Sequence, residues 1–126
     1  MPDEDIRFME RALRQAHLAI ERGGGEVGWV IARNGEVIAE GYNEGELRND
    51  PTAHAEMVTL RRAGERLQGI DFSGCVLYCT LQPCGMCTLA CVWAKISRVV
   101  YGVTRDALST SSGTQEGHSG NGRCHG

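Results

Sequence analysis

The sequence has 126 residues, of which 41% are hydrophobic and 23% charged, and its formal net charge at pH 7 is −3. These values fit one globular domain. The acidic balance argues against a protein that binds phosphate backbones through a basic surface, so nucleic acid is not the expected partner. Six cysteines follow an N-terminus without an apolar leader, so we expect reduced thiols and a cytoplasmic location.

The first expected element is a helix from Asp3 to Arg22. Acidic residues crowd its first turn and Arg22 stands in its last, which suits the helix dipole. Three glycines, residues 23–25, end it. Apolar residues recur at spacings of three and four, which predicts that one face packs on the core: Ile6, Met9, Leu13, Ala16 and Ile20.

Two antiparallel strands are expected next, at Val27–Arg33 and Glu36–Tyr42. They are joined by Asn34-Gly35, a strong hairpin signal because both residues readily take positive φ. The polar segment 43–51 then reads as a loop.

The rest of the chain alternates between helix and strand patterns. We expect helices at Thr52–Leu67 and Cys84–Lys95, and strands at Cys75–Thr80 and Ser97–Val103. The last strand–helix–strand unit should be parallel. This order predicts an α/β fold, a three-layer α/β/α sandwich with a mixed sheet.

Two further regions of the chain bear on its organisation. We assign residues 1–108 to the folded domain and 109–126 to a tail rich in Gly and Ser, without apolar periodicity. The run from Phe72 to Ala94 has no charge and is long enough to span a bilayer, but Pro83 would break a helix there. We therefore expect no membrane segment.

Two motifs place metal-binding side chains at the starts of the second and third helices. "TAHAEMV" carries His54 and Glu56, and "LQPCGMCTL" carries Cys84 and Cys87. Residues three apart share a helix face, so both sulfurs can reach one ion. One imidazole and two thiolates suit zinc, and three protein ligands are typical of catalytic zinc. The offset of Glu56 from His54 favours proton transfer over metal binding.

Two other interpretations of these residues stay open. In a closed structural zinc site, Cys79 or Cys91 would supply a fourth ligand, but Glu56 would then have no role. A redox C-x-x-C motif would need neither the histidine nor the glutamate. Arg61, Arg62 and Arg66 are expected to form a solvated helix face.

The paired motifs match the H-x-E…P-C-x-x-C pattern of zinc-dependent nucleobase deaminases. With "GEVIAEGYN", "DPTAHAE", "CVLYCTLQPC" and "RVVYG", the stretch from Ile6 to Val103 resembles the zinc-dependent cytidine/deoxycytidylate deaminase superfamily. It is most similar to the branch that holds guanine deaminases, tRNA adenosine deaminases and fungal cytosine deaminases. The chain departs from the usual pattern at Glu26, Trp29 and Gln82.

The resemblance implies a cytidine deaminase-like fold and a role for each matching residue. One zinc ion would be held by His54, Cys84 and Cys87, with Glu56 as the catalytic proton shuttle. Substrate contacts would come from the side chain of Asn43, the backbone N–H of Ala55, and Trp93.

The resemblance also implies hydrolytic deamination of a nucleobase or nucleoside, with release of ammonia. A guanine-like purine is favoured because "CVWAK" around Trp93 is similar to guanine deaminases, while cytosine and adenine remain possible bases. A tRNA adenosine deaminase and a non-catalytic zinc protein are the alternatives. A homodimer is expected through the apolar segment "MCTLACVWA".

Overall fold

The structure is a computed structural model that describes residues 2–23, 25–44 and 48–103. Its helices are α1 (Asp3–Arg22), α3 (Ala55–Leu67) and α4 (Gly85–Ala94). Its strands are β1 (Gly28–Arg33), β2 (Glu36–Tyr42), β3 (Val76–Leu81) and β4 (Arg98–Val103). The predicted domain boundary at residue 108 and the predicted tail lie outside the described residues.

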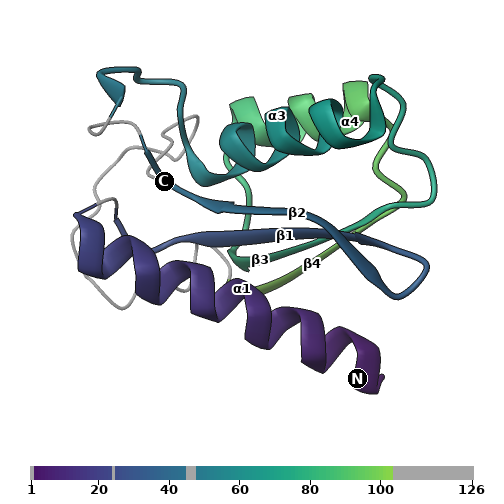
Figure 1. The fold of residues 1–126 in the computed structure, drawn as a ribbon, viewed down its shortest axis with the longest axis horizontal. Coiled ribbons are helices and arrows are strands. Elements are labelled where there is room, and N and C mark those ends of the chain that lie inside the picture. Colours follow the sequence, from purple (N-terminus) through teal and green to yellow (C-terminus); the bar gives the residue numbers. More distant parts are fainter. Residues whose placement is uncertain (1, 24, 45–47, 104–126) are drawn as a thin grey trace.

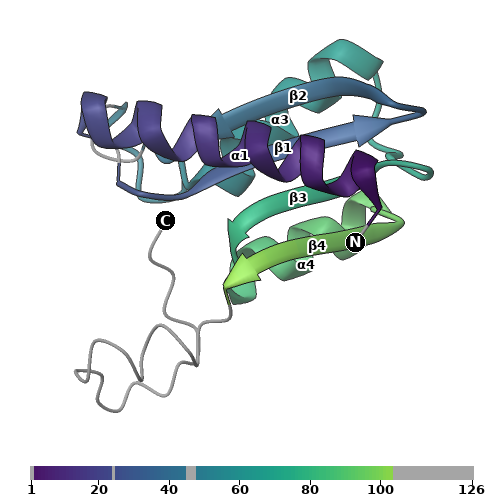
Figure 2. The same cartoon turned by 90° about the horizontal axis from the view of Figure 1, so that it is seen from below.

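The strands form one mixed sheet in the order β2-β1-β3-β4. Strand β1 pairs antiparallel with both β2 and β3, whereas β3 and β4 are parallel. Helix α1 covers one face of the sheet, and α3 and α4 lie side by side on the other (Figures 1 and 2). The three-layer α/β/α sandwich and its parallel last unit are therefore confirmed.

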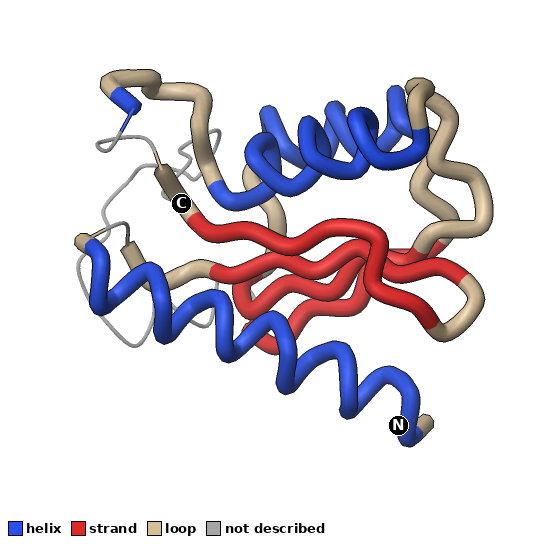
Figure 3. Tube along the Cα trace, in the orientation of Figure 1, coloured by secondary structure: helices blue, strands red, loops and turns tan. Residues whose placement is uncertain are grey.

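The direction of the strands places the loops that follow β2 and β3 at the same end of the sheet. Since β2 and β3 both run antiparallel to β1, they run in the same direction and end at the same side of the sheet. The loops that leave them there lead into α3 and α4, as the tan segments of Figure 3 show. Of the described residues, 43–44, 48–54 and 82–84 are thus brought to one end of the sandwich.

The hairpin between β1 and β2 turns as predicted. Asn34 and Gly35 have φ values of 54° and 77°, the left-handed region that this turn requires. The register shifts once, between Ile31 and Ala32, which marks a β-bulge.

Helix α1 has the predicted bounds, but of its predicted inward face only Ala16 and, in part, Met9 are buried. Ile6, Leu13 and Ile20 are 44%, 47% and 59% exposed. The reason is the close approach of α1 to β1, because a Cβ on Gly28 would lie only 2.1 Å from the backbone oxygen of Ala12. Such an approach requires small side chains where α1 crosses Gly28, and Ala12 and Ala16 lie there. The residues of the buried face are Asp5, Phe8, Ala12, Gln15, Ala16 and Ala19.

An ion pair between the buried Asp5 and the half-exposed Arg98 ties α1 to β3 and β4. The Tyr78 hydroxyl donates a hydrogen bond of 2.6 Å to Asp5 Oδ1, and Arg98 donates to both carboxylate oxygens at 2.7 and 3.1 Å. Hydrogen bonds from Arg98 and then Tyr78 lower the pKa of Asp5, whereas burial raises the pKa of Tyr78. These contacts fix the start of α1 on the sheet.

Two arginines of α3 cover the edge of the sheet formed by β2. Arg62 Nη1 donates to the Glu40 backbone oxygen at 2.9 Å, and Arg66 Nη1 donates to that of Val37 at 2.8 Å. Both side chains remain exposed, as predicted, but they also bind carbonyls of an edge strand. An edge strand leaves such groups unpaired, so the arginines stabilise it and block its pairing with other chains.

The uncharged run from Phe72 to Ala94 is divided between β3 and α4. Within the described ranges, no helix is both long enough and apolar enough to cross a membrane.

Candidate metal centre

The predicted metal ligands lie at the starts of two neighbouring helices. Helix α3 begins at Ala55 and α4 at Gly85, so His54 and Cys84 are the residues that immediately precede the first turns. Both have extended backbones, with ψ values of 159° and 179°. Our prediction that both lie in the first turn is therefore wrong, because α3 begins at Ala55 rather than Thr52 and α4 at Gly85 rather than Cys84. Neither side chain makes a capping hydrogen bond to its helix.

The structure brings His54, Glu56, Cys84 and Cys87 together. Each offers one ligand atom, and these four atoms lie within 4.8 Å of one another. The sulfurs of Cys84 and Cys87 are 3.3 Å apart. All four residues are buried, and Glu56 is only 1% exposed. The arrangement joins the H-x-E and C-x-x-C motifs into a single site.

The chemistry of these atoms fits a cation. His54 Nδ1 and Glu56 Oε1 are buried, and neither has a hydrogen-bond partner in the described structure. A buried polar atom without a partner costs about 1–3 kcal/mol, so such atoms are rare unless a ligand or ion satisfies them. One imidazole nitrogen and two sulfurs are the donors that zinc prefers. The residues present therefore fit a zinc ion.

The electrostatics of the two helix starts favour the same conclusion. The first N–H groups of each helix have no partner within the helix, and they leave a partial positive charge there. Cys87 lies in the first turn of α4, where this field favours the thiolate that a metal requires.

The structure gives no support to a fourth cysteine ligand. Neither Cys79 nor Cys91 belongs to the cluster found among the described residues. Burial, and to a smaller extent the charge of Glu56, raises the pKa of Cys91 to about 12, which favours a neutral thiol. Cys79 is fully buried in β3 and contacts the backbone oxygen of Val100 at 3.7 Å. Both cysteines pack in the core.

The three predicted substrate contacts occupy different surroundings. Asn43 directly follows β2 and is partly exposed, while Ala55 is the first residue of α3 and is fully buried. Both therefore lie at the end of the sandwich that holds the metal centre. Trp93 lies near the end of α4 with 72% of its surface exposed. The roles of all three residues stay predictions.

Trp29, one of the departures from the family pattern, is a core residue. It is fully buried in the cluster of apolar side chains that also contains Ala55, Cys84 and Cys87. The tryptophan therefore supports the metal centre from the sheet side.

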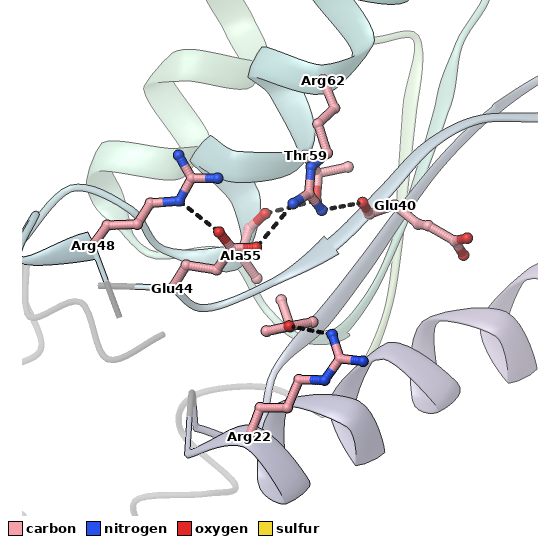
Figure 4. A network of polar contacts seen from close by, with 8 residues as sticks. Arg22, Glu40, Glu44, Arg48, Ala55, Thr59 and Arg62 are labelled. Atoms are coloured by element: carbon pink, nitrogen blue, oxygen red, sulfur yellow. Dashed lines mark hydrogen bonds and ion pairs between the residues drawn. The ribbon is translucent and has the colours of Figure 1, made fainter. Parts of the chain in front are cut away.

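Sequence reasoning missed the ion pairs formed by the residue that follows Asn43. Glu44, its neighbour in the chain, is buried and accepts hydrogen bonds from Arg48 and Arg62 (Figure 4). Arg62 also binds the backbone of Glu40. Glu44 and Arg62 are far apart in the sequence, so no local pattern predicts their contact.

Comparison with known proteins identifies the family of this chain. Residues 2–103 match the model of the cytidine and deoxycytidylate deaminase zinc-binding region. The tRNA-specific adenosine deaminase of Aquifex aeolicus is 44% identical over 94 residues, and the guanine deaminase of Bacillus subtilis is 41% identical over 95 residues. Each alignment covers 75% of this chain, and the chain spans about six tenths of the length of these curated relatives.

Solved structures give the same result. The X-ray structure of the Bacillus subtilis guanine deaminase has a TM-score of 0.80 and 37% sequence identity, covering 88% of this chain and 70% of its own. A structure from a study of tRNA:A34 deaminases has a TM-score of 0.76 and 42% identity, covering 79% and 76%. The chain therefore belongs to the cytidine and deoxycytidylate deaminase family, and it carries the zinc-binding region of that family within residues 2–103.

Proposed function

We propose that the protein is a zinc-dependent hydrolase that removes an amino group from a purine base as ammonia. The observation that carries this proposal is the buried cluster of His54, Glu56, Cys84 and Cys87, whose ligand atoms lie within 4.8 Å of one another. The family match adds support, since both of the named relatives are deaminases.

In this proposal, His54, Cys84 and Cys87 hold the zinc ion and Glu56 moves protons. A bound zinc ion would lower the pKa of a water molecule towards 7 and so supply the nucleophile. Glu56 takes a proton from the attacking water and gives it to the ring nitrogen beside the amino-bearing carbon. It then carries the second proton of that water from the hydroxyl added to the carbon to the amino group, so that the C–N bond breaks, a carbonyl forms and ammonia leaves. Glu56 Oε1 has no partner among the described residues, so this oxygen is available for the transfers.

Asn43, Ala55 and Trp93 are the proposed contacts to the base. An amide side chain offers a donor and an acceptor together, which suits the edge of a base. The backbone N–H of Ala55 belongs to the first turn of α3, where N–H groups have no acceptor within the helix. It can therefore donate to a carbonyl oxygen of the substrate. Trp93 would line the pocket.

A free guanine-like purine is our first choice of substrate, and an adenosine of tRNA is the second. Guanine, adenine and cytosine all carry an amino group on a carbon beside a ring nitrogen, so the chemistry does not separate them. The relatives support both choices, because some are named for guanine and others for tRNA. The expectation that nucleic acid is not a partner gains no support from these relatives.

We also propose a cytoplasmic homodimer that associates through α4. Leu89, Val92 and Trp93 project from this helix with 49%, 64% and 72% of their surfaces exposed. Contiguous exposed apolar surface of this kind marks interaction sites. A partner on this face would cover Trp93, which is the most exposed of the three.

The test is ammonia release by the zinc-loaded protein over a panel of substrates. The panel contains guanine, adenine, cytosine, their nucleosides and an anticodon stem-loop of tRNA. We expect Glu56→Ala to lower kcat at least about ten-thousand-fold, the upper end for general acid–base catalysis, with zinc retained. A variant that keeps zinc and most of its activity would refute the role of Glu56, and loss of zinc would make Glu56 a ligand.

A further inference from the structure

The segment that carries Asn43 is anchored to α3 and to the residue before His54. On its N-terminal side, Tyr42 ends β2 and pairs with Gly28 of β1. On its C-terminal side, the backbone N–H of Glu44 donates to the backbone oxygen of Ala53 at 2.8 Å. Asn43 therefore lies between two anchored residues. Tyr42 is fixed at the end of β2, and Glu44 is hydrogen-bonded to Ala53, the residue before His54.

The side chain of Glu44 adds a second anchor. Its carboxylate Oε2 accepts from Arg62 Nη2 at 2.9 Å, and Oε1 accepts from Arg48 Nε (Figure 4). Only 10% of the Glu44 side chain is exposed, compared with 42% of Arg62. Charge-assisted hydrogen bonds to a mostly buried acceptor are stronger than ordinary surface pairs. A buried carboxylate would be costly without them, so the pairing restrains the backbone of residue 44.

Arg62 joins three parts of the chain at once. It lies on the second turn of α3, the helix whose first turn carries Glu56. Its Nη1 donates to the Glu40 backbone oxygen of β2 while its Nη2 binds Glu44. A guanidinium is planar and rigid, so one group held at both ends fixes the relative positions of helix, strand and loop.

We propose that Glu44 and Arg62 form a clamp that positions Asn43 at the metal centre. Neither residue touches the proposed zinc site, so both are positioning residues. The inference rests on the proposed function, in which Asn43 holds the base. Misplacing a substrate-holding group by about 1 Å can cost up to about a hundred-fold in activity, so a rigid support of this kind has a catalytic use.

The chain offers a closely matched control for Arg62. Arg66 lies one turn further along α3 and also donates to carbonyls of β2, at Val37 and Ile38. Arg62→Ala and Arg66→Ala therefore remove similar contacts between α3 and β2. They differ in that Arg62 alone of the two also binds Glu44.

The first measurement is hydrogen exchange of the Glu44 backbone N–H in the zinc-loaded protein without substrate. We expect Arg62→Ala to speed this exchange about ten-fold or more, because the loop opens more often. Arg66→Ala should leave it unchanged, and the N–H of Val58, which donates to the His54 backbone oxygen within α3, should be unaffected in both variants. Equal exchange at Glu44 in wild type and both variants would overturn the clamp.

The second measurement is steady-state kinetics on whichever substrate of the panel the wild type deaminates. We expect Arg62→Ala to raise KM about ten-fold with kcat changed less than about three-fold, the pattern of a lost binding contact. Arg62→Lys, which can reach Glu44 as a point charge, should recover part of the loss. Zinc content should stay at the wild-type level. Equal effects of Arg62→Ala and Arg66→Ala on KM would show a general role in stability and overturn the clamp.

The two measurements separate this inference from the proposed function. If the wild type deaminates no member of the panel, the proposed function fails, and exchange at Glu44 still decides whether the clamp exists. If the wild type is active and the exchange of Glu44 does not respond to Arg62→Ala, the clamp fails and the function stands.

Discussion

Replacing Gly41 by alanine tests whether close contact between α3 and β2 shapes the site. A Cβ at this position would lie 2.7 Å from Thr59 Oγ1 and 3.2 Å from both Arg62 Nη1 and Val58 Cγ1. Thr59 cannot easily rotate away, because it is fully buried and its hydroxyl donates to the Ala55 backbone oxygen at 2.7 Å. The helix itself must therefore move away from β2.

The magnitude follows from the size of this clash. The distance from the new methyl group to Thr59 must grow from 2.7 Å to at least 3.4 Å for ordinary contact. Overpacking of this kind costs about 1–3 kcal/mol, which for a domain of this size lowers Tm by about 4–12 °C. The same movement shifts α3, which carries Glu56, so kcat/KM should fall by up to about a hundred-fold at 20 °C.

The assay is thermal unfolding of the zinc-loaded protein together with activity at a temperature where the variant is folded. Gly64→Ala is the control on the same helix, because its nearest neighbour would be 3.4 Å away and it should not lower Tm. Adding Gly41→Ala to a Thr59→Ala background should cost less than half of what it costs in the wild type, because the nearest atom is gone. If the Tm of Gly41→Ala lies within about 1 °C of the wild-type Tm, the reasoning is refuted.

Three further outcomes are expected. Metal analysis should find one zinc ion per chain and a large loss in Cys84→Ala and Cys87→Ala, so full occupancy in both variants would contradict the assignment. Since Arg98 lowers the pKa of Asp5 below 3.8, Asp5 stabilises the fold above its unfolded pKa and loses this effect as the pH falls through the lower folded value. Chemical denaturation below about pH 4 should therefore show a steeper loss of stability in the wild type than in Asp5→Asn. Light scattering at micromolar concentration should show a dimer that Trp93→Asp dissociates, and a monomeric wild type would exclude that assembly.

Local patterns predicted the elements and their layers but not which face of α1 is buried. The bounds of α1 and the turn at Asn34 and Gly35 depend on capping, charge and backbone preferences within a few residues, and they were confirmed. The buried face of α1 depends on Gly28, which lets the helix approach β1 so closely that alanines fit better than Leu13 or Ile20. Nothing near α1 in the sequence reveals that approach.

The site shows the same division between local and long-range information. The ligand motifs predicted which four residues the structure brings together, because zinc chemistry limits the residue types and spacings that can serve. The start of α3 was predicted three residues too early and that of α4 one residue too early, since His54 and Cys84 have extended backbones that their sequence context does not reveal. The contact between Glu44 and Arg62 requires the fold to bring two distant residues together, so it was not predictable.

The absence of capping hydrogen bonds from His54 and Cys84 has a consequence for which substitutions would stabilise the metal-free protein. Serine or aspartate at these two positions would accept hydrogen bonds from N–H groups in the first turn of each helix and add about 1 kcal/mol apiece to the metal-free fold. Selection for stability alone would therefore favour replacements that abolish metal binding. A descendant with these replacements is expected to be the more stable protein and to bind no metal.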